Sequence, residues 1–143
     1  TAQIAASGVT ADKLSAAART RVSVCSFGAD VAANREQAIF VAPTDGVITG
    51  VSLVAVAGIA ADGTGEAIWE FEVENQTGPA VVATATTKTD AIVAYTPLDL
   101  DLSQVTGALD IATGDVLVLT ATKTGAVADL KGLAVAITYQ VEE

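Results

Sequence analysis

The sequence contains no histidine and only one cysteine, Cys25. Without histidine, the chain lacks the commonest general base, the commonest metal ligand and the imidazole of serine and cysteine triads. One thiol cannot form an intrachain disulfide, and a zinc site would have to rely on carboxylates alone. We therefore expect no catalytic residues, no metal site and no cofactor. Because Cys25 lies among apolar neighbours, we expect it to be a buried, unreactive thiol.

Aromatic side chains and long apolar runs are also scarce. The chain has one Trp, two Tyr and three Phe, too few for the aromatic platforms on which a polysaccharide-active jelly roll would stack sugar rings. The carboxylates that such an enzyme would need are present at Glu70 and Glu72, but their spacing is typical of a solvated strand face. No apolar run approaches the roughly 18 residues that span a bilayer, and no signal peptide opens the chain. We expect a soluble protein that is made in a cytoplasm.

Basic residues are few and unevenly placed. Seventeen Asp and Glu against seven Lys and Arg give a net charge of −10. Residues 1–35 hold four basic and two acidic side chains, so this segment is +2 and the remainder is −12. A body this negative repels phosphate, which argues against nucleic-acid or anionic-membrane binding. Two interpretations stay open: the acidic charge keeps an apolar-rich protein soluble, or the basic segment docks on an acidic partner while the body faces solvent.

From Arg21 onward, the sequence shows the period-two alternation of β-strands. In Ile68–Asn75, for example, three apolar side chains alternate with three glutamates. Turn residues separate the apolar segments, as in Pro43-Thr44-Asp45-Gly46. We expect strands at residues 21–27, 36–42, 47–56, 68–75, 81–87, 91–95, 98–102, 116–122 and 133–141. This pattern predicts an all-β domain over residues 21–143, a β-sandwich or jelly roll of about eight strands.

Residues 1–20 differ from the rest and are predicted to form an N-terminal arm. Thr10 is suited to cap a helix, and Val9 and Leu14 have the spacing of a hydrophobic staple. A helix this short is marginal alone in water. It therefore either becomes ordered against its own domain, a sister chain or another protein, or stays disordered in isolation.

Several stretches resemble tailed-phage virion proteins. The opening segment Ile4–Leu14, with Gly8-Val9-Thr10 followed by Lys13-Leu14, resembles segments common in phage fibre and virion-surface proteins. The stretches Ile39–Val51 and Ala112–Gly125 are similar to those of small phage structural proteins. With the closing Thr138-Tyr139-Gln140, the resemblance covers most of residues 36–141, in framework and turn patterns rather than a catalytic fingerprint.

This resemblance implies a capsid decoration (cement) protein. Such proteins bind the outer surface of the shell, brace the major capsid protein and form homo-oligomers, with a trimer favoured here. The expected location is the exterior of the virion capsid, after synthesis in the cytoplasm of a bacterial host. The residues expected to dock the arm on its partner are Ile4, Val9, Lys13, Leu14, Arg19 and Arg21. For these residues, intramolecular packing and ordinary solubility are the open alternative.

The arm pattern is also typical of fibres. The alternative function is therefore the tip or collar domain of a tail or head fibre involved in host attachment. That function predicts an exposed aromatic or loop-rich patch at one end of the domain, whereas decoration requires only a docking face and an arm.

Overall fold

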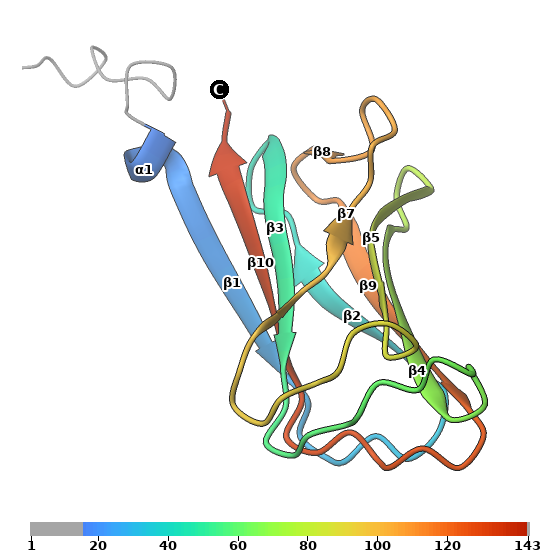
Figure 1. The fold of residues 1–143 in the computed structure, drawn as a ribbon. Coiled ribbons are helices and arrows are strands. Elements are labelled where there is room, and N and C mark those ends of the chain that lie inside the picture. Colours follow the sequence, from blue (N-terminus) through green and yellow to red (C-terminus); the bar gives the residue numbers. More distant parts are fainter. Residues whose placement is uncertain (1–15, 143) are drawn as a thin grey trace, which may run out of the picture.

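A computed structural model describes residues 16–142, with side chains from residue 18 on, and it shows an all-β fold with two antiparallel sheets (Figure 1). The predicted all-β class is thus confirmed. Within the described residues, the only helix is α1 (Ala16–Arg19), a single turn before the first strand. The strands are β1 (Thr20–Ser26), β2 (Arg35–Val41), β3 (Gly46–Val54), β4 (Ile68–Asn75), β5 (Ala80–Thr86), β6 (Leu98–Asp99), β7 (Asp101–Leu102), β8 (Asp110–Ile111), β9 (Val116–Thr124) and β10 (Ala134–Val141).

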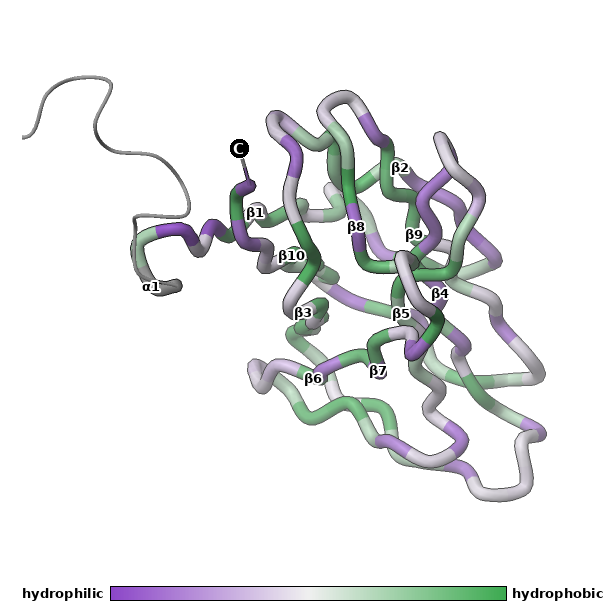
Figure 2. Tube along the Cα trace, turned by 90° about the horizontal axis from the view of Figure 1, so that it is seen from above, coloured by the Kyte–Doolittle hydropathy of each residue, from purple (hydrophilic) through white to green (hydrophobic). Residues whose placement is uncertain are grey.

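The chain passes from one sheet to the other at every connection except the β4–β5 hairpin, which stays in the second sheet. The first sheet has the order β1-β10-β3-β6, with β8 also paired to β3, and the second has the order β2-β9-β4-β5-β7. Long antiparallel ladders hold each sheet together, with seven residue pairs between β1 and β10 and eight between β4 and β9. The two sheets lie as two layers when seen from above (Figure 2). Each layer therefore has an inner face toward the other sheet and an outer face away from it.

One apolar core lies between the sheets and contains side chains from both. Alternation places Trp69, Phe71 and Val73 of β4 in this core, all at most 2% exposed, and directs the intervening glutamates outward. From the first sheet, Val51, Leu53 and other inward side chains are equally buried. In β9, Leu117, Val118 and Leu119 are buried in succession, so this strand is covered on both faces at this point. Burial of such side chains contributes about 1.5–3 kcal/mol each, which is the main stabilisation of the fold.

The longest loops gather at one end of the molecule, and the two ends of the described chain lie at the other, together with the shorter connections (Figure 1). The β1–β2, β3–β4, β5–β6 and β9–β10 connections lie at the loop end, where the isolated bridges Val31↔Leu130 and Ile59↔Ile92 tie them together. Gly125 begins one connection at φ 68°, and a Cβ there would overlap the carbonyl oxygen of Glu66. Only glycine fits this turn.

The structure differs from the sequence-based expectations for one strand and for Cys25, and it describes only the end of the predicted arm. Most of the predicted arm, residues 1–20 with its helix from Thr10, lies outside the described residues, and β1 already begins at Thr20. The strand expected at Ala91–Tyr95 is wrong: this segment is a loop with one bridge at Ile92, and Tyr95 has φ 59°. Cys25 is half-buried rather than buried, because β1 lies at the edge of its sheet.

Candidate functional site

The structure places two of the six residues expected to dock the arm, Arg19 and Arg21. Arg19 is half-buried at the end of α1, and Arg21 is exposed on β1. The Arg21 guanidinium Nη1 donates to the carbonyl oxygens of Ala18, at 2.6 Å, and Thr20, at 3.0 Å. Ile4, Val9, Lys13 and Leu14 lie outside the described residues. The two placed arginines put positive charge where α1 meets the first sheet.

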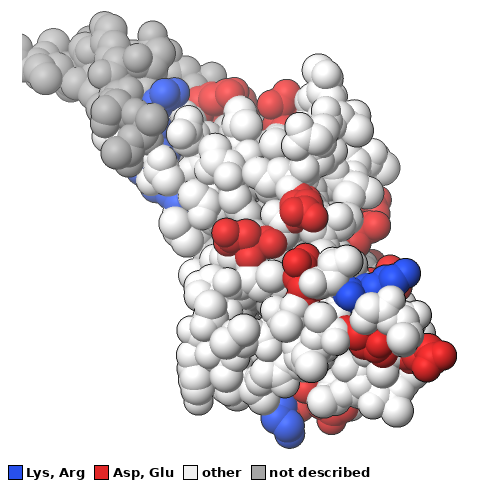
Figure 3. Space-filling view, in the orientation of Figure 1, with Lys and Arg blue, Asp and Glu red and all other residues white. Residues whose placement is uncertain are grey.

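The outer face of the first sheet is uncharged over its three long strands, because Arg21, the one charged residue in these strands, pairs with the buried Tyr139 and so has the inward parity. Val22 and Val24 of β1 face outward and are 61% and 63% exposed. The cross-strand neighbours of these valines are small residues. Val24 lies beside Ala136, which lies beside Ser52, and Val22 lies beside Thr138, which lies beside Gly50. Figure 3 shows uncharged surface along this side of the molecule, below the basic side chains near α1. We call this surface, formed by Val22, Val24, Gly50, Ser52, Val54, Ala134, Ala136 and Thr138, the neutral face.

A shallow apolar hollow of about 160 Å³ lies on the neutral face. Its walls include Val24 of β1, Ser52 and Val54 of β3, and Ala136 of β10. Pro97, in the loop before β6, completes the wall. The first charged side chain beyond it is Asp99 of β6, which pairs with Ser52. An apolar hollow bordered by charge at one edge can accept an apolar side chain of a partner.

The outer face of the second sheet is acidic. One row of directly paired residues crosses all five strands: Asp101 of β7, Thr84 of β5, Glu72 of β4, Thr120 of β9 and Glu36 of β2. A second row consists of Thr86, Glu70 and Thr122. We call this surface, formed by Glu36, Glu70, Glu72, Thr84, Thr86, Asp101, Thr120 and Thr122, the acidic face.

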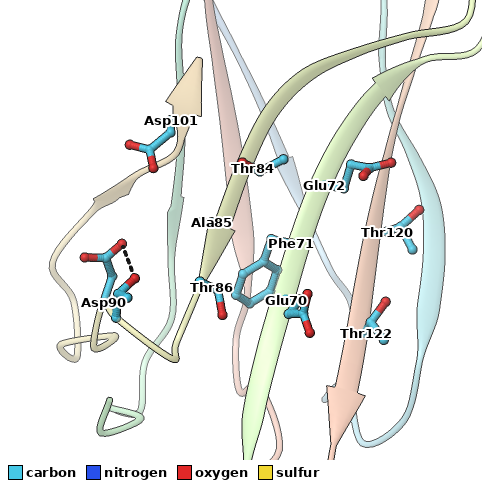
Figure 4. A pocket seen from close by; sticks show the side chains of 11 residues that line it. Glu70, Phe71, Glu72, Thr84, Ala85, Thr86, Asp90, Asp101, Thr120 and Thr122 are labelled. Atoms are coloured by element: carbon cyan, nitrogen blue, oxygen red, sulfur yellow. Dashed lines mark hydrogen bonds between the residues drawn. The ribbon is translucent and has the colours of Figure 1, made fainter. Parts of the chain in front are cut away.

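A hollow of about 480 Å³ lies on the acidic face, with Glu70, Glu72 and Asp101 around it (Figure 4). Within the described residues the ion pairs are Lys123–Asp129 and Lys131–Asp30, so these carboxylates have no basic partner there. Their oxygens point outward among threonine hydroxyls (Figure 4). Such a surface repels anions and remains hydrated.

Two other carboxylates, those of Asp62 and Asp115, accept hydrogen bonds from neighbouring turn residues. The Asp62 carboxylate accepts hydrogen bonds from the Thr64 hydroxyl, at 2.6 Å, and from the Thr64 and Ala67 backbone N–H groups. The Thr64 hydroxyl and backbone N–H hold the pKa of Asp62 below its usual value. The backbone N–H of Ala112 and the Asn75 amide lower the pKa of Asp115 in the same way. Hydrogen bonds within and between turns thus account for the positions of both carboxylates.

Neither a metal-binding geometry nor a membrane-spanning helix is found in residues 16–142. No group of three or more Cys, Asp and Glu side chains there converges as metal ligands would. No helix of that range is long and apolar enough to cross a bilayer. Cys25 accepts a weak hydrogen bond from the Gln37 amide nitrogen at 3.5 Å, which links the edges of the two sheets.

The loop end carries a second exposed apolar region. Tyr95 and Val93 are 76% and 59% exposed, and Val56 of the neighbouring loop is 44% exposed. The Tyr95 backbone N–H donates to the Ala55 carbonyl oxygen at 2.9 Å, which joins the two loops. Because the backbone is tied while the ring is exposed, Tyr95 presents a fixed aromatic contact at this end.

Sequence reasoning found the acidic face but missed the neutral face. The Glu70-Glu72-Glu74 alternation directly predicts an outward acidic row. The Val22-Val24 alternation has the appearance of a core face, and only the small residues opposite it on the neighbouring strands, with the exposure of the valines themselves, show that this side is uncovered. That signal depends on knowing the pairing.

No protein-family model matches the chain, and no match was found among curated proteins or solved structures.

Proposed function

We propose that this chain is a structural virion protein that binds the outer surface of a phage capsid as a decoration (cement) protein and stabilises the shell. The partner is the major capsid protein, and the bound form is a homo-oligomer, for which the resemblance favours a trimer. The body is proposed to be a jelly-roll-like β-sandwich. In support, one layer has the strand order β1-β10-β3-β6 and the facing layer has the order β2-β9-β4-β5, as in a jelly roll built from two Greek keys.

The observation that carries the proposal is the difference between the two outer faces. The neutral face exposes valines, alanines and threonine with no acidic side chain on its three long strands, whereas the acidic face carries carboxylates without a basic partner among residues 18–142. Desolvating a carboxylate without a partner is costly, while burying an exposed valine is favourable. The neutral face is therefore the side that can lie on a shell, and the acidic face is the side that can remain in water.

The arm is proposed to act on the same side. Its described part, α1, leads directly into β1, the edge strand that carries Val22 and Val24 of the neutral face (Figure 1). Apolar arm residues such as Ile4, Val9 and Leu14 would then add contacts next to this face, with Lys13, Arg19 and Arg21 directed at acidic groups of the shell. A protein that binds only the assembled shell stabilises it by mass action, more strongly as occupancy rises.

The first test removes the arm. Deletion of residues 1–15 leaves β1 intact and is expected to leave the β body folded by circular dichroism while abolishing co-sedimentation with undecorated shells. Undiminished binding of this truncated chain would refute the role of the arm.

A pair of matched substitutions tests the faces. Ala136→Glu places a charge in the centre of the neutral face and is expected to weaken shell binding at least about tenfold, because it buries an unpaired carboxylate. Thr120→Glu places the same charge on the acidic face and is expected to leave binding within about twofold, since rim and solvent-facing charges contribute little. Equal effects of the two substitutions would contradict the assignment of the docking side.

The alternative function is the tip or collar domain of a phage tail or head fibre, and one observation favours it. The loop end presents Tyr95, Val93 and Val56 as an exposed apolar group at the opposite end of the domain from α1, as a receptor-binding tip would. The copy number per virion separates the two functions. The copy number is measured by densitometry of purified virions, with the major shell protein as the reference. Hundreds of copies per virion are expected for decoration, whereas a few to a few tens would favour the fibre.

A further inference from the structure

The edges of the two sheets are protected unequally. An unpaired edge strand invites pairing with another chain, and proteins usually blunt it with charge, a bulge or short length. The edge strands β6, β7 and β8 have two residues each, and each carries an aspartate. The edge strand β2 carries Glu36 and has a register shift between Ala38 and Phe40.

Strand β1 has neither short length nor a bulge, and its only charged side chain is Arg21. It is seven residues long, pairs with β10 in unbroken register and contains neither proline nor an acidic residue. Its outward valines, Val22 and Val24, are more than 60% exposed. Among the edge strands of the described chain, β1 is therefore the one that is open to pairing.

The ladder shows which backbone groups of β1 are available. The Phe27 N–H donates to the carbonyl oxygen of Leu133, its direct partner, at 2.8 Å. In an antiparallel pair, hydrogen-bonded and non-hydrogen-bonded residues alternate. Cys25 and Ser23 therefore direct their N–H and C=O groups toward β10, and the corresponding groups of Val24 and Val22 point away from the sheet.

We propose that β1 pairs antiparallel with β1 of a second copy of this chain, about a two-fold axis through Ser23. This register overlaps all seven residues and places Val22 opposite Val24 of the other copy, and Val24 opposite Val22. Each of these pairs exchanges two backbone hydrogen bonds, and the four valines form a cross-strand apolar cluster. The two neutral faces become one continuous surface.

The composition of β1 favours a second copy as the occupant. Two molecules of net charge −10 repel one another, and this repulsion is weakest where neither surface carries a carboxylate. Strand β1 is the one edge strand in the described chain without an acidic residue, and its only charged side chain is Arg21. In the proposed register Arg21 lies opposite Cys25, so the two Arg21 residues are separated by four positions, about 13 Å along the strand.

The pairing is isologous, so it makes a two-fold dimer rather than the trimer that the resemblance implies. It concerns the free chain and does not depend on capsid binding. An experiment on the free chain can therefore refute the β1 pairing without bearing on capsid binding, and loss of capsid binding would not by itself refute the pairing.

Sedimentation of the free full-length chain provides the first test. The wild type is expected to be a dimer, and Val24→Lys is expected to raise the dimer dissociation constant at least about tenfold, because it places two lysines in the valine cluster. The matched control is Val41→Lys on β2, whose side chain is equally exposed, at 61%, and lies on an edge of the other sheet. This control is expected to remain dimeric.

Val24→Pro tests the hydrogen bonds separately. It removes an N–H that points away from β10, so the β1–β10 ladder is retained while pairing with a second copy is lost. Thermal melting checks that both Val24 variants fold. A wild-type monomer, or an oligomer that persists in folded Val24→Lys and Val24→Pro, would overturn the proposal.

Cysteine cross-linking tests the register. Two Ser23 residues face each other at a non-hydrogen-bonded position with Cα atoms about 4.5 Å apart, within disulfide range. In a Cys25→Ala background, Ser23→Cys is expected to give a disulfide-linked dimer under mild oxidation. The control Ser26→Cys, on the same strand, is expected to stay monomeric on a non-reducing gel, because its two copies are six positions apart. Equal cross-linking of the two variants, or none at Ser23→Cys, would contradict this register.

Discussion

At the scale of single residues, buried polar side chains in this protein are held by turns. Asn75, only 4% exposed, donates from its amide nitrogen to an Asp115 carboxylate oxygen at 2.9 Å. The same Asp115 oxygen accepts from the Ala112 N–H at 3.0 Å, and the Asn75 side-chain oxygen accepts from the Thr77 N–H. These bonds join the turn before β9 to the turn after β4.

The lowered pKa of Asp115 predicts a defined pH dependence. A carboxyl group with a lower pKa in the folded than in the unfolded state binds fewer protons when folded, so its contribution is complete above the unfolded value. That contribution is lost as pH falls from about 3.8 through the lowered folded pKa. Asp115→Ala is expected to reduce the free energy of unfolding by about 1–3 kcal/mol at neutral pH, since it leaves the buried Asn75 amide unpaired.

Urea denaturation at a series of pH values measures the difference in free energy of unfolding between the wild type and Asp115→Ala. The gap in unfolding free energy between wild type and Asp115→Ala should narrow as pH falls below about 3.8. A gap that stays constant to the lowest pH would show that the ionised carboxylate is not the stabilising form.

At the scale of elements, one aromatic pair joins the two sheets. Phe40 of β2 and Tyr139 of β10 are 6% and 7% exposed, and their ring centroids lie 5.2 Å apart at an interplanar angle of 58°. Because β2 is an edge strand with a register shift at this point, its attachment depends on side-chain packing as well as on its ladder with β9. This contact keeps the β2 edge closed against the first sheet.

Truncation of this pair predicts a measurable coupling. Phe40→Ala is expected to lower the free energy of unfolding by about 3–5 kcal/mol, as for other buried aromatic residues. A double-mutant cycle with Tyr139→Leu should give a coupling of about 0.5–1.5 kcal/mol, the range for aromatic pairs. Strictly additive effects in chemical denaturation would mean that the two rings stabilise the fold independently.

At the scale of the whole molecule, charge is separated between two faces. The acidic face gathers carboxylates that have no basic partner in the described chain, while the neutral face has none on its three long strands. The proposed contacts, β1 with a second copy and the neutral face with a shell, both use the side on which the net charge of −10 is least concentrated.

Repulsion among the three glutamates of β4 predicts that neutralising one of them raises the free energy of unfolding, by an amount that depends on salt concentration. Glu72 lies two residues from both Glu70 and Glu74 on the outward side of β4. Glu72→Gln removes the central charge and is expected to raise the free energy of unfolding by about 0.2–1 kcal/mol at low salt. At 1 M salt, where the screening length is about 3 Å, the gain should largely disappear. Thermal melts at both salt concentrations measure it, and a gain that salt leaves unchanged would point to a non-electrostatic cause.

Much of the secondary structure was predictable because alternation is a local property. The strand at Ile68–Asn75 matches its predicted bounds, and the acidic row on it follows from a side-chain period of two. The segment Ala91–Tyr95 failed because it has strand-forming residues without a neighbouring strand to pair with. Propensity alone does not supply a partner.

The sequence by itself determined the all-β class, most strand positions, the lack of histidine chemistry and the acidic outward row. Only the tertiary structure decided that β1 is an edge, that Val22 and Val24 face outward, and that small residues of β3 and β10 continue their face. The physical reason is that alternation defines two faces of a strand without stating which is covered. Coverage and edge position follow from pairings between residues far apart in the chain, such as Cys25 with Val135 and Val135 with Leu53.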